Sequence, residues 1–222
     1  MALALPGARG LFRQMQEAFC HSKGKRVTLS TGVHESLEDF KWLAEDVANQ
    51  PTRMYEIVLI QPTVDGYHDA SRYMCGGVVL SGPTAIPRKF PPQSSTVQPS
   101  PNPKGAHSIV WRIPFPKDII DSLVSWKNPQ GTVNNFELEL AGGLLHSDCV
   151  SQWFVVKERT TLLRTGNTSG IWGQRKGSTT CTSAPAHLLQ LQAMHQRFHR
   201  YIPHIDFVSG VDDLISDCTS CS

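Results

Sequence analysis

The 222-residue sequence has no long hydrophobic run, no dense set of cysteines and almost no excess of charge of either sign. No stretch approaches the run of about 20 apolar residues that a bilayer requires. The apolar start of the chain is broken by Pro6 and Gly7, which excludes a signal-peptide core. The six cysteines are scattered, a pattern that favours reduced thiols in an intracellular protein, without distinguishing cytoplasm from nucleus. We therefore expect a chain with no membrane partner.

The formal net charge is only +2, so any affinity for nucleic acid must come from a local basic face. Hydrophobic residues make up 40% of the chain, which is enough for a substantial core. Apolar residues recur at helical spacing over 10–21 and again from Thr31 to Val47, and Pro51 ends the second pattern. Residues 1–52 are thus predicted to be a helical appendage to a domain that spans 53–222.

The spacing of the apolar residues changes after residue 52. Extended segments are predicted at 54–60, 63–69, 75–80, 107–115, 160–164 and 202–208. Helices are predicted at 117–126, 134–154, 167–174, from Pro185 onward, and at 211–218, where the chain ends after barely entering the helix. Residues 82–106 hold seven prolines and no apolar period, which predicts a loop. An antiparallel meander followed by crossover helices implies an α/β fold with a mixed sheet and helices on both faces.

Acidic residues stand where such a sheet would bring them together. Asp69 ends the predicted strand 63–69, Glu137 and Glu139 open the long helix, and Asp217 lies in the last helix. Carboxylates that converge above a sheet can hold hard divalent cations. A pair of such cations activates water and stabilises the leaving oxygen of a phosphodiester.

Four segments carry a family resemblance. The segment His-Asp-Ala-Ser-Arg-Tyr-Met-Cys-Gly-Gly-Val-Val (68–79) resembles the first-strand motif of retroelement ribonucleases H, and Asn-Asn-Phe-Glu-Leu-Glu-Leu-Ala-Gly (134–142) resembles their helix motif. Leu-Leu-Arg-Thr-Gly-Asn-Thr-Ser (162–169) is similar to their strand that ends in Thr-Asp-Asn-Thr, and 206–220 is similar to their terminal motif. The first helices resemble the tail of a reverse-transcriptase connection segment.

The resemblance implies a ribonuclease-H-like mixed five-stranded sheet flanked by helices, with an N-terminal helical appendage and a truncated C-terminal helix. It implies metal-dependent hydrolysis of the RNA strand of an RNA–DNA hybrid, with Mg²⁺ or Mn²⁺ held by Asp69, Glu139 and Asp217. Glu139 is preferred over Glu137 because it directly precedes Leu-Ala-Gly. The remaining part of a reverse-transcriptase polyprotein is the implied protein partner.

The chain departs from the family where a third aspartate is expected. Either Gly166 or Asn167 takes that position, and neither supplies a charged oxygen ligand. Asp213 and Cys221 also stand where the family has Asn and Arg. Impaired cleavage is therefore expected, and the alternative is a non-catalytic remnant of a retrotransposon that binds nucleic acid or protein.

Basic and aromatic residues are candidates for contact with the hybrid, whose phosphates and 2′-hydroxyls the family grips. The residues predicted to bind nucleic acid are Arg72, Arg164, Trp172, Arg175 and Lys176, and a second basic cluster is formed by His195, Arg197, His199 and Arg200. His195 and His199 also have the helical spacing of metal ligands, but no third ligand is marked, which favours a polar helix face. Cys218 and Cys221 form a lone CxxC without a partner pair.

Overall fold

One mixed sheet organises the chain. The computed structural model describes residues 12–20, 22, 24, 29–89, 97–100, 108–168, 171 and 183–209. The strands are β1 (Val64–Ala70), β2 (Met74–Ser81), β3 (Val97–Ser100), β4 (Ser108–Pro114), β5 (Thr160–Thr165) and β6 (Ile202–Phe207). The helices are α1 (Arg13–Cys20), α2 (Thr31–Asn49), the 3-10 helix η2 (Met54–Glu56), α3 (Lys117–Asp121), α4 (Asn135–Trp153) and α6 (Ser183–His199).

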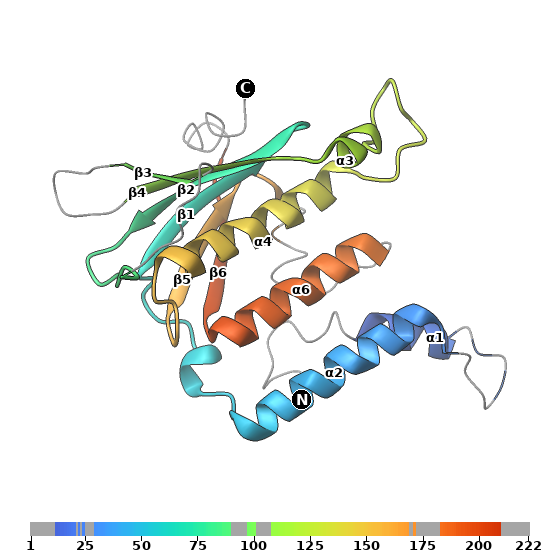
Figure 1. The fold of residues 1–222 in the computed structure, drawn as a ribbon, viewed down its shortest axis with the longest axis horizontal. Coiled ribbons are helices and arrows are strands. Elements are labelled where there is room, and N and C mark those ends of the chain that lie inside the picture. Colours follow the sequence, from blue (N-terminus) through green and yellow to red (C-terminus); the bar gives the residue numbers. More distant parts are fainter. Residues whose placement is uncertain are drawn as a thin grey trace.

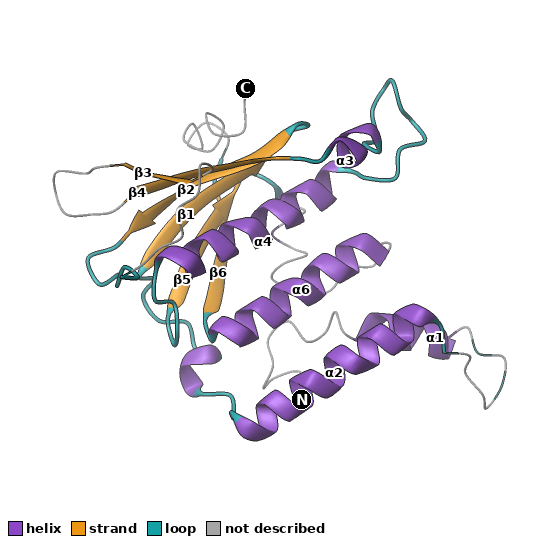
Figure 2. Cartoon of the chain, viewed as in Figure 1, coloured by secondary structure: helices purple, strands orange, loops and turns teal. Residues whose placement is uncertain are grey.

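The sheet order is β3-β4-β2-β1-β5-β6 (Figure 2). Strands β1, β2 and β4 form an antiparallel meander, whereas β5 lies parallel to β1 and β6 parallel to β5. This is the strand order of a ribonuclease-H-like fold, so the predicted α/β fold class, a mixed five-stranded sheet flanked by helices, is confirmed. A sixth strand, β3, extends the sheet antiparallel to β4.

Helix α4 lies against the sheet because the sequence gives it a defined start and apolar surface on most sides. Asn134 caps it by accepting a hydrogen bond from the Glu137 backbone N–H at 3.2 Å, and the Glu137 carboxylate accepts one from the Asn134 N–H at 2.7 Å. Figure 1 shows α4 next to the sheet, α6 beyond it on the same side, and α2 outermost. The prediction of helices on both faces therefore depends on 211–218, which lie outside the described residues.

Strand β1 and helix α4 approach closely because each presents a glycine to a histidine of the other. A Cβ at Gly66 of β1 would lie 2.0 Å from His146 Nε2, and a Cβ at Gly142 of α4 would lie 3.1 Å from His68 Cδ2. Alternate residues of β1, from Val64 to Ala70, are buried on the side of the sheet that faces α4. Both imidazoles are consequently enclosed, with 0% and 2% of His68 and His146 exposed.

Two sequence predictions are wrong in this part of the chain. Residues 54–60 are not a strand: Met54–Glu56 form the 3-10 helix η2, and the apolar side chains around it are exposed to between 38% and 74%. The proline-rich segment 82–106 is not wholly a loop, because Val97–Ser100 form the edge strand β3. A strand at the edge of a sheet tolerates proline, since one side of its backbone needs no partner.

A buried ionic network, which we call the Glu56 network, joins helix α2 and the 3-10 helix η2 to helix α6. Glu56 accepts hydrogen bonds from Arg197 Nη1 at 3.0 Å and from Arg200 Nε at 3.0 Å, while Arg197 also pairs with Asp46 of α2. Glu56, Arg197 and Arg200 are only 6%, 7% and 8% exposed. The prediction that both arginines supply phosphate contacts is therefore wrong, because their guanidinium groups are buried and paired. The boundary at 52 and 53 remains a prediction.

Candidate functional site

The candidate site lies where β1 ends and α4 begins. Asp69 is the penultimate residue of β1, paired with Gly76 of β2, and the strand alternation makes it half-buried where His68 and Ala70 are buried. Glu139 lies in the second turn of α4 and is 3% exposed. The two side chains come from segments 70 residues apart in the sequence, and the close packing of α4 on β1 brings them into one electrostatic environment.

The pKa of Glu139 reports that environment. Burial, and after it the neighbouring charge of Asp69, raise the pKa of Glu139 to about 8. Neutral donors act in the opposite direction: Thr165 Oγ1 lies 3.5 Å from Glu139 Oε2, and the Asn167 side chain is a further hydrogen-bond partner. Within the described part of the chain, no positively charged side chain is among the causes of the pKa of Glu139. The two carboxyl groups therefore interact with each other closely enough for the charge of Asp69 to act on Glu139.

Glu137 and Glu139 have different surroundings. The Glu137 carboxylate is used by the capping box at the start of α4, where it accepts a hydrogen bond from the Asn134 N–H. Glu139 instead interacts with Asp69, Thr165 and Asn167. The role of Glu139 as a metal ligand stays a prediction.

Of the two residues considered for the third acidic position, Asn167 is in contact with Glu139. The Asn167 side chain hydrogen-bonds Glu139, and the Asn167 backbone N–H donates to Thr165 Oγ1 at 3.3 Å just beyond the end of β5. The Asn167 amide supplies an oxygen donor without negative charge, whereas Gly166 has no side chain. The match of either residue to the family's aspartate stays a prediction.

The remaining predicted site residues have different environments. Asp217, Trp172, Arg175 and Lys176 lie outside the described residues. Arg72 is exposed in the turn between β1 and β2, with its guanidinium 5.5 Å from the centre of the Tyr73 ring.

Arg164, on β5, is less available than Arg72 for contact with a phosphate. Its Nη2 atom lies 3.3 Å from Asp65 Oδ2, and its Nη1 donates to the Tyr67 hydroxyl at 2.5 Å. Its side chain is 31% exposed. A phosphate contact by Arg164 would have to compete with this ion pair, and it stays a prediction.

Sequence reasoning missed the buried histidines behind the site. Burial lowers the pKa of His68 to about 4 and holds the pKa of His146 well below its ordinary value, so both are neutral near pH 7. Trp111 Nε1 donates to His146 Nδ1 at 3.2 Å. The available signal was positional, since His68 has the same parity in β1 as the core residues Val64 and Ala70.

The donor set suits a hard cation in type but is incomplete. Asp69, Glu139 and Asn167 offer carboxylate and amide oxygens, which Mg²⁺ prefers. In the described part of the chain, no three His, Cys, Asp or Glu side chains form a ready-made metal site. A cation at this place would therefore depend on water or substrate oxygens, or on a residue such as Asp217.

Comparisons with known proteins add little. No protein-family model matches the chain, and no curated protein matches it significantly. Among solved structures, the crystal structure of prototype foamy virus protease-reverse transcriptase (native) is similar at a TM-score of 0.31 and 11% identity. The likeness covers 91% of this chain and 22% of that chain, so this chain spans less than a quarter of the viral protein. A TM-score this low carries no argument, and the fold assignment depends on the strand order alone.

No helix in the described ranges combines the length and the hydropathy that a membrane crossing needs.

Proposed function

We propose that this chain is a ribonuclease-H-like module that hydrolyses the RNA strand of an RNA–DNA hybrid in a metal-dependent reaction, at a rate reduced by Asn167. The observation that carries the proposal is the meeting of Asp69 and Glu139 at the end of the central strand of a ribonuclease-H-like sheet. The chain's resemblance to retroelement ribonucleases H supports the same function, and the proposal includes that the module is part of a reverse-transcriptase polyprotein.

In this proposal Asp69, Glu139 and Asp217 hold Mg²⁺ or Mn²⁺, which supplies an activated water and stabilises the leaving oxygen. Glu139 must lose its proton to serve as a ligand, because its pKa of about 8 leaves it mostly protonated at neutral pH. Loading is therefore coupled to proton release and improves as the pH rises. Asn167 fills the third position without the charge that a carboxylate would add.

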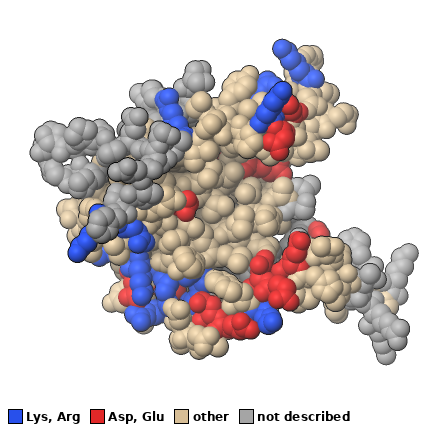
Figure 3. Space-filling model, in the orientation of Figure 1, with Lys and Arg blue, Asp and Glu red and all other residues tan. Residues whose placement is uncertain are grey.

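The nucleic acid is proposed to approach the turn between β1 and β2. Arg72 and Tyr73 are exposed there, two residues beyond the strand that carries Asp69, and can contact a phosphate and stack on a base or sugar. The opposite side of the molecule is unfavourable for nucleic-acid binding, because its acidic side chains would repel the phosphates. Figure 3 shows acidic side chains gathered along α2, whose sequence contains Glu35, Glu38, Asp39, Glu45 and Asp46 against one lysine, Lys41.

A cleavage assay on a labelled RNA–DNA hybrid with Mg²⁺ or Mn²⁺ tests the proposal. Asp69→Asn and Glu139→Gln should abolish cleavage. Glu137→Gln is the matched control, because a capping box accepts Gln as well as Glu and the residue lies two positions away on the same helix. Asn167→Asp should raise the rate by roughly tenfold or more, since it supplies the missing charged ligand.

Each result has a defined meaning. Cleavage in the unsubstituted chain that Asp69→Asn does not reduce would refute the assignment of the site. Binding of the hybrid without cleavage, unchanged by Asn167→Asp, would instead identify a non-catalytic nucleic-acid-binding module. Arg72→Ala should weaken hybrid binding. It should also reduce the magnitude of the slope of log affinity against log salt concentration by about one, since one phosphate contact is lost.

A further inference from the structure

The segment between α3 and α4, residues 122–133, forms an ordered loop that projects from the body of the molecule (Figure 1). We call it the Trp126 loop, because the Trp126 side chain is 99% exposed, the largest exposed fraction of any large hydrophobic side chain in the described ranges. An indole ring has one of the largest apolar surfaces of any side chain, so leaving it in water forgoes a large stabilisation. The position of Trp126 therefore indicates a role outside the fold.

The loop has a defined conformation. At its base, the Val124 N–H donates to the Val133 carbonyl at 2.7 Å. At its tip, Ser125 and Asn128 exchange two backbone hydrogen bonds of 3.0 Å, and Trp126 lies in the turn between them. Because the turn is already formed, little conformational entropy is lost when the exposed ring meets a partner.

The loop is also rooted in the core beside the candidate site. Leu123 is 6% exposed and belongs to the hydrophobic core. A Cβ at Gly131 would lie 2.6 Å from backbone atoms of Leu123 and Val124, so the two arms approach more closely than a larger residue would allow. The loop then leads directly into Asn134, the cap of α4, and Glu139 lies about 8 Å further along the helix axis. The base of the loop and the candidate site are therefore at the same end of α4.

The surroundings of Trp126 favour a nucleic-acid strand over a protein partner. Within the loop, whose residues are all described, Val124 is the other exposed large hydrophobic side chain, at 51%. A stable protein interface buries about 800 Å² on each partner, with its aromatic anchors inside a wider patch. An isolated ring beside an exposed lysine, Lys127, instead matches the way proteins hold single strands, where bases stack on aromatic side chains and cations contact phosphates.

We propose that the Trp126 loop binds an unpaired nucleotide that adjoins the RNA–DNA hybrid, with the Trp126 ring stacked on the base and the Lys127 ammonium group on a phosphate. This inference rests on the proposed function, which places the hybrid at the start of α4. The base must be unpaired, because neighbouring base pairs cover both faces of a base inside a duplex, whereas single strands can splay their bases onto aromatic rings. Since every base has such a face, the contact tolerates any sequence.

The test is fluorescence anisotropy of three labelled ligands, measured without divalent cations so that no cleavage occurs. The ligands are a blunt RNA–DNA hybrid, the same hybrid with single-stranded extensions at both ends, and the single strand alone. The extended hybrid should bind about tenfold more tightly than the blunt hybrid. Trp126→Ala should abolish this difference, and Trp126→Tyr should keep most of it. Lys127→Gln should reduce the magnitude of the slope of log affinity against log salt concentration by about 0.7 for the single strand.

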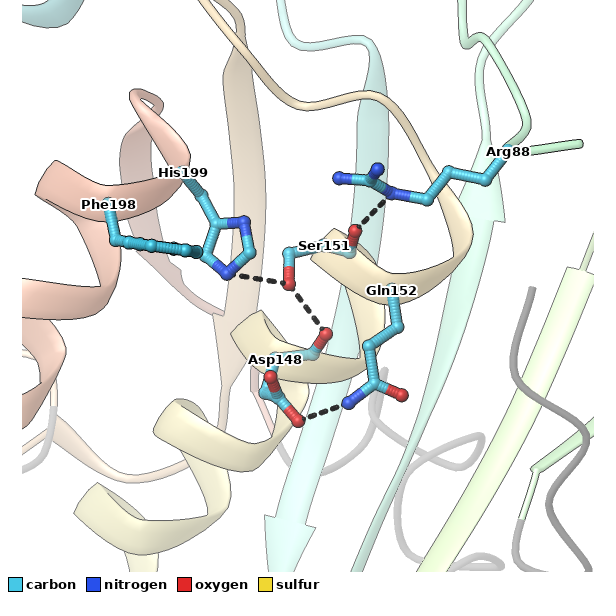
Figure 4. Close-up of a pocket in the computed structure, with 6 residues that line it drawn as sticks. All are labelled: Arg88, Asp148, Ser151, Gln152, Phe198 and His199. Carbon is cyan, nitrogen blue, oxygen red and sulfur yellow. Dashed lines mark hydrogen bonds between the residues drawn. The ribbon is translucent and has the colours of Figure 1, made fainter. Parts of the chain in front are cut away.

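Phe198 offers a matched control, because its ring is 72% exposed at the far end of α4 from the candidate site. It lies beside an open hollow in which Gln152 donates to Asp148 and Arg88 donates to the Ser151 carbonyl (Figure 4). Phe198→Ala should leave all three affinities unchanged. Gly131→Ala keeps the indole ring but disturbs the loop that carries it, so it should reduce the preference for the extended hybrid, with circular dichroism as the check on the fold.

The outcomes separate this inference from the proposed function. Cleavage of the blunt hybrid, without any preference for the extended one, would overturn the inference and leave the ribonuclease function in place. A preference that depends on Trp126, in a chain that cleaves no hybrid, would support the inference and count against the ribonuclease function alone.

Three other results would also overturn the inference. The first is an equal loss of affinity for blunt and extended hybrids in Trp126→Ala, because the ring would then contact the duplex. The second is a preference for the extended hybrid that Trp126→Ala retains or that Phe198→Ala also removes. The third is self-association of the chain that Trp126→Ala abolishes while nucleic-acid binding stays unchanged, because that result identifies a protein contact.

Discussion

Replacing Glu56 by Gln should destabilise the protein far more than the loss of an equally short surface ion pair. The Glu56 carboxylate receives Arg197 and Arg200, and all three side chains are less than a tenth exposed. Glutamine keeps the volume but removes the carboxylate that pairs with Arg200 and leaves Arg197 with Asp46 as its remaining acidic partner. Breaking a buried pair from one side costs about 3–5 kcal/mol. That is a large part of the roughly 5–15 kcal/mol that stabilises a folded domain.

The measurement is urea unfolding followed by circular dichroism. With an m-value near 3 kcal/mol/M, the expected loss lowers the midpoint of Glu56→Gln by about 1–1.7 M. Glu158→Gln is the control, because Glu158 pairs with Arg53 at 2.6 Å while the Arg53 side chain is 60% exposed. Exposed pairs contribute about 0–1 kcal/mol, so its midpoint should fall by less than about 0.3 M. Equal shifts in the two variants would refute the argument that burial, not distance, sets the strength of these pairs.

Three further predictions concern β1, α4 and pH. Gly66→Ala should unfold or strongly destabilise the chain, because its Cβ would meet the enclosed His146 ring, whereas Gly24→Ala, with open space around it, should be neutral in the same urea assay. The contribution of Glu139 to stability should fall as the pH rises from about 4.5 to about 8, because its raised pKa lets the folded state keep a proton that the unfolded chain has released. Stability should also fall as the pH drops from 6.5 toward 4, because folded His68 resists the proton that the unfolded chain takes up.

Matched variants make the pH predictions specific. Glu139→Gln should remove the decline above pH 6.5 when unfolding free energies are compared at several pH values, while Glu137→Gln should keep it. A decline of the same size in Glu139→Gln would contradict the pKa assignment. Between pH 4.5 and 6.5 Glu139 and His68 act in opposite directions, so the His68 prediction is read in the Glu139→Gln variant. A stability of that variant that stays flat from pH 6.5 down to 4 would contradict the burial of neutral His68. Unchanged stability of folded Gly66→Ala would contradict the close approach of β1 and α4.

Local sequence patterns were sufficient for the central part of the fold. The extended segment 63–69 and the long helix 134–154 carry Asp69 and Glu139, and an α/β fold with a mixed sheet was enough to predict that these elements adjoin. The segment 54–60 shows where such patterns fail. Its run of apolar residues is typical of a strand, but Glu56 within it is held by Arg197 and Arg200, and this distant ionic contact determines the local backbone.

The site could be predicted only in part for a similar reason. A motif can mark Asp69 and Glu139, but it cannot decide between Gly166 and Asn167, because that choice depends on where the chain leaves β5. Likewise, the spacing of His195 and His199 shows two imidazoles on one helix. Their polar partners come from α4, about 45 residues earlier, and only the packing of α4 on α6 brings them into range.

Both outermost strands of the sheet contain an imino acid: Pro99 in β3 and Pro203 in β6. Each position lacks the amide hydrogen that an incoming chain would need for a continuous ladder. Lateral growth into fibrils or strand-mediated dimers is thereby discouraged at either end, so association with other macromolecules should involve side chains on loops and helices. Pro203→Thr would be expected to lower the concentration at which the protein aggregates.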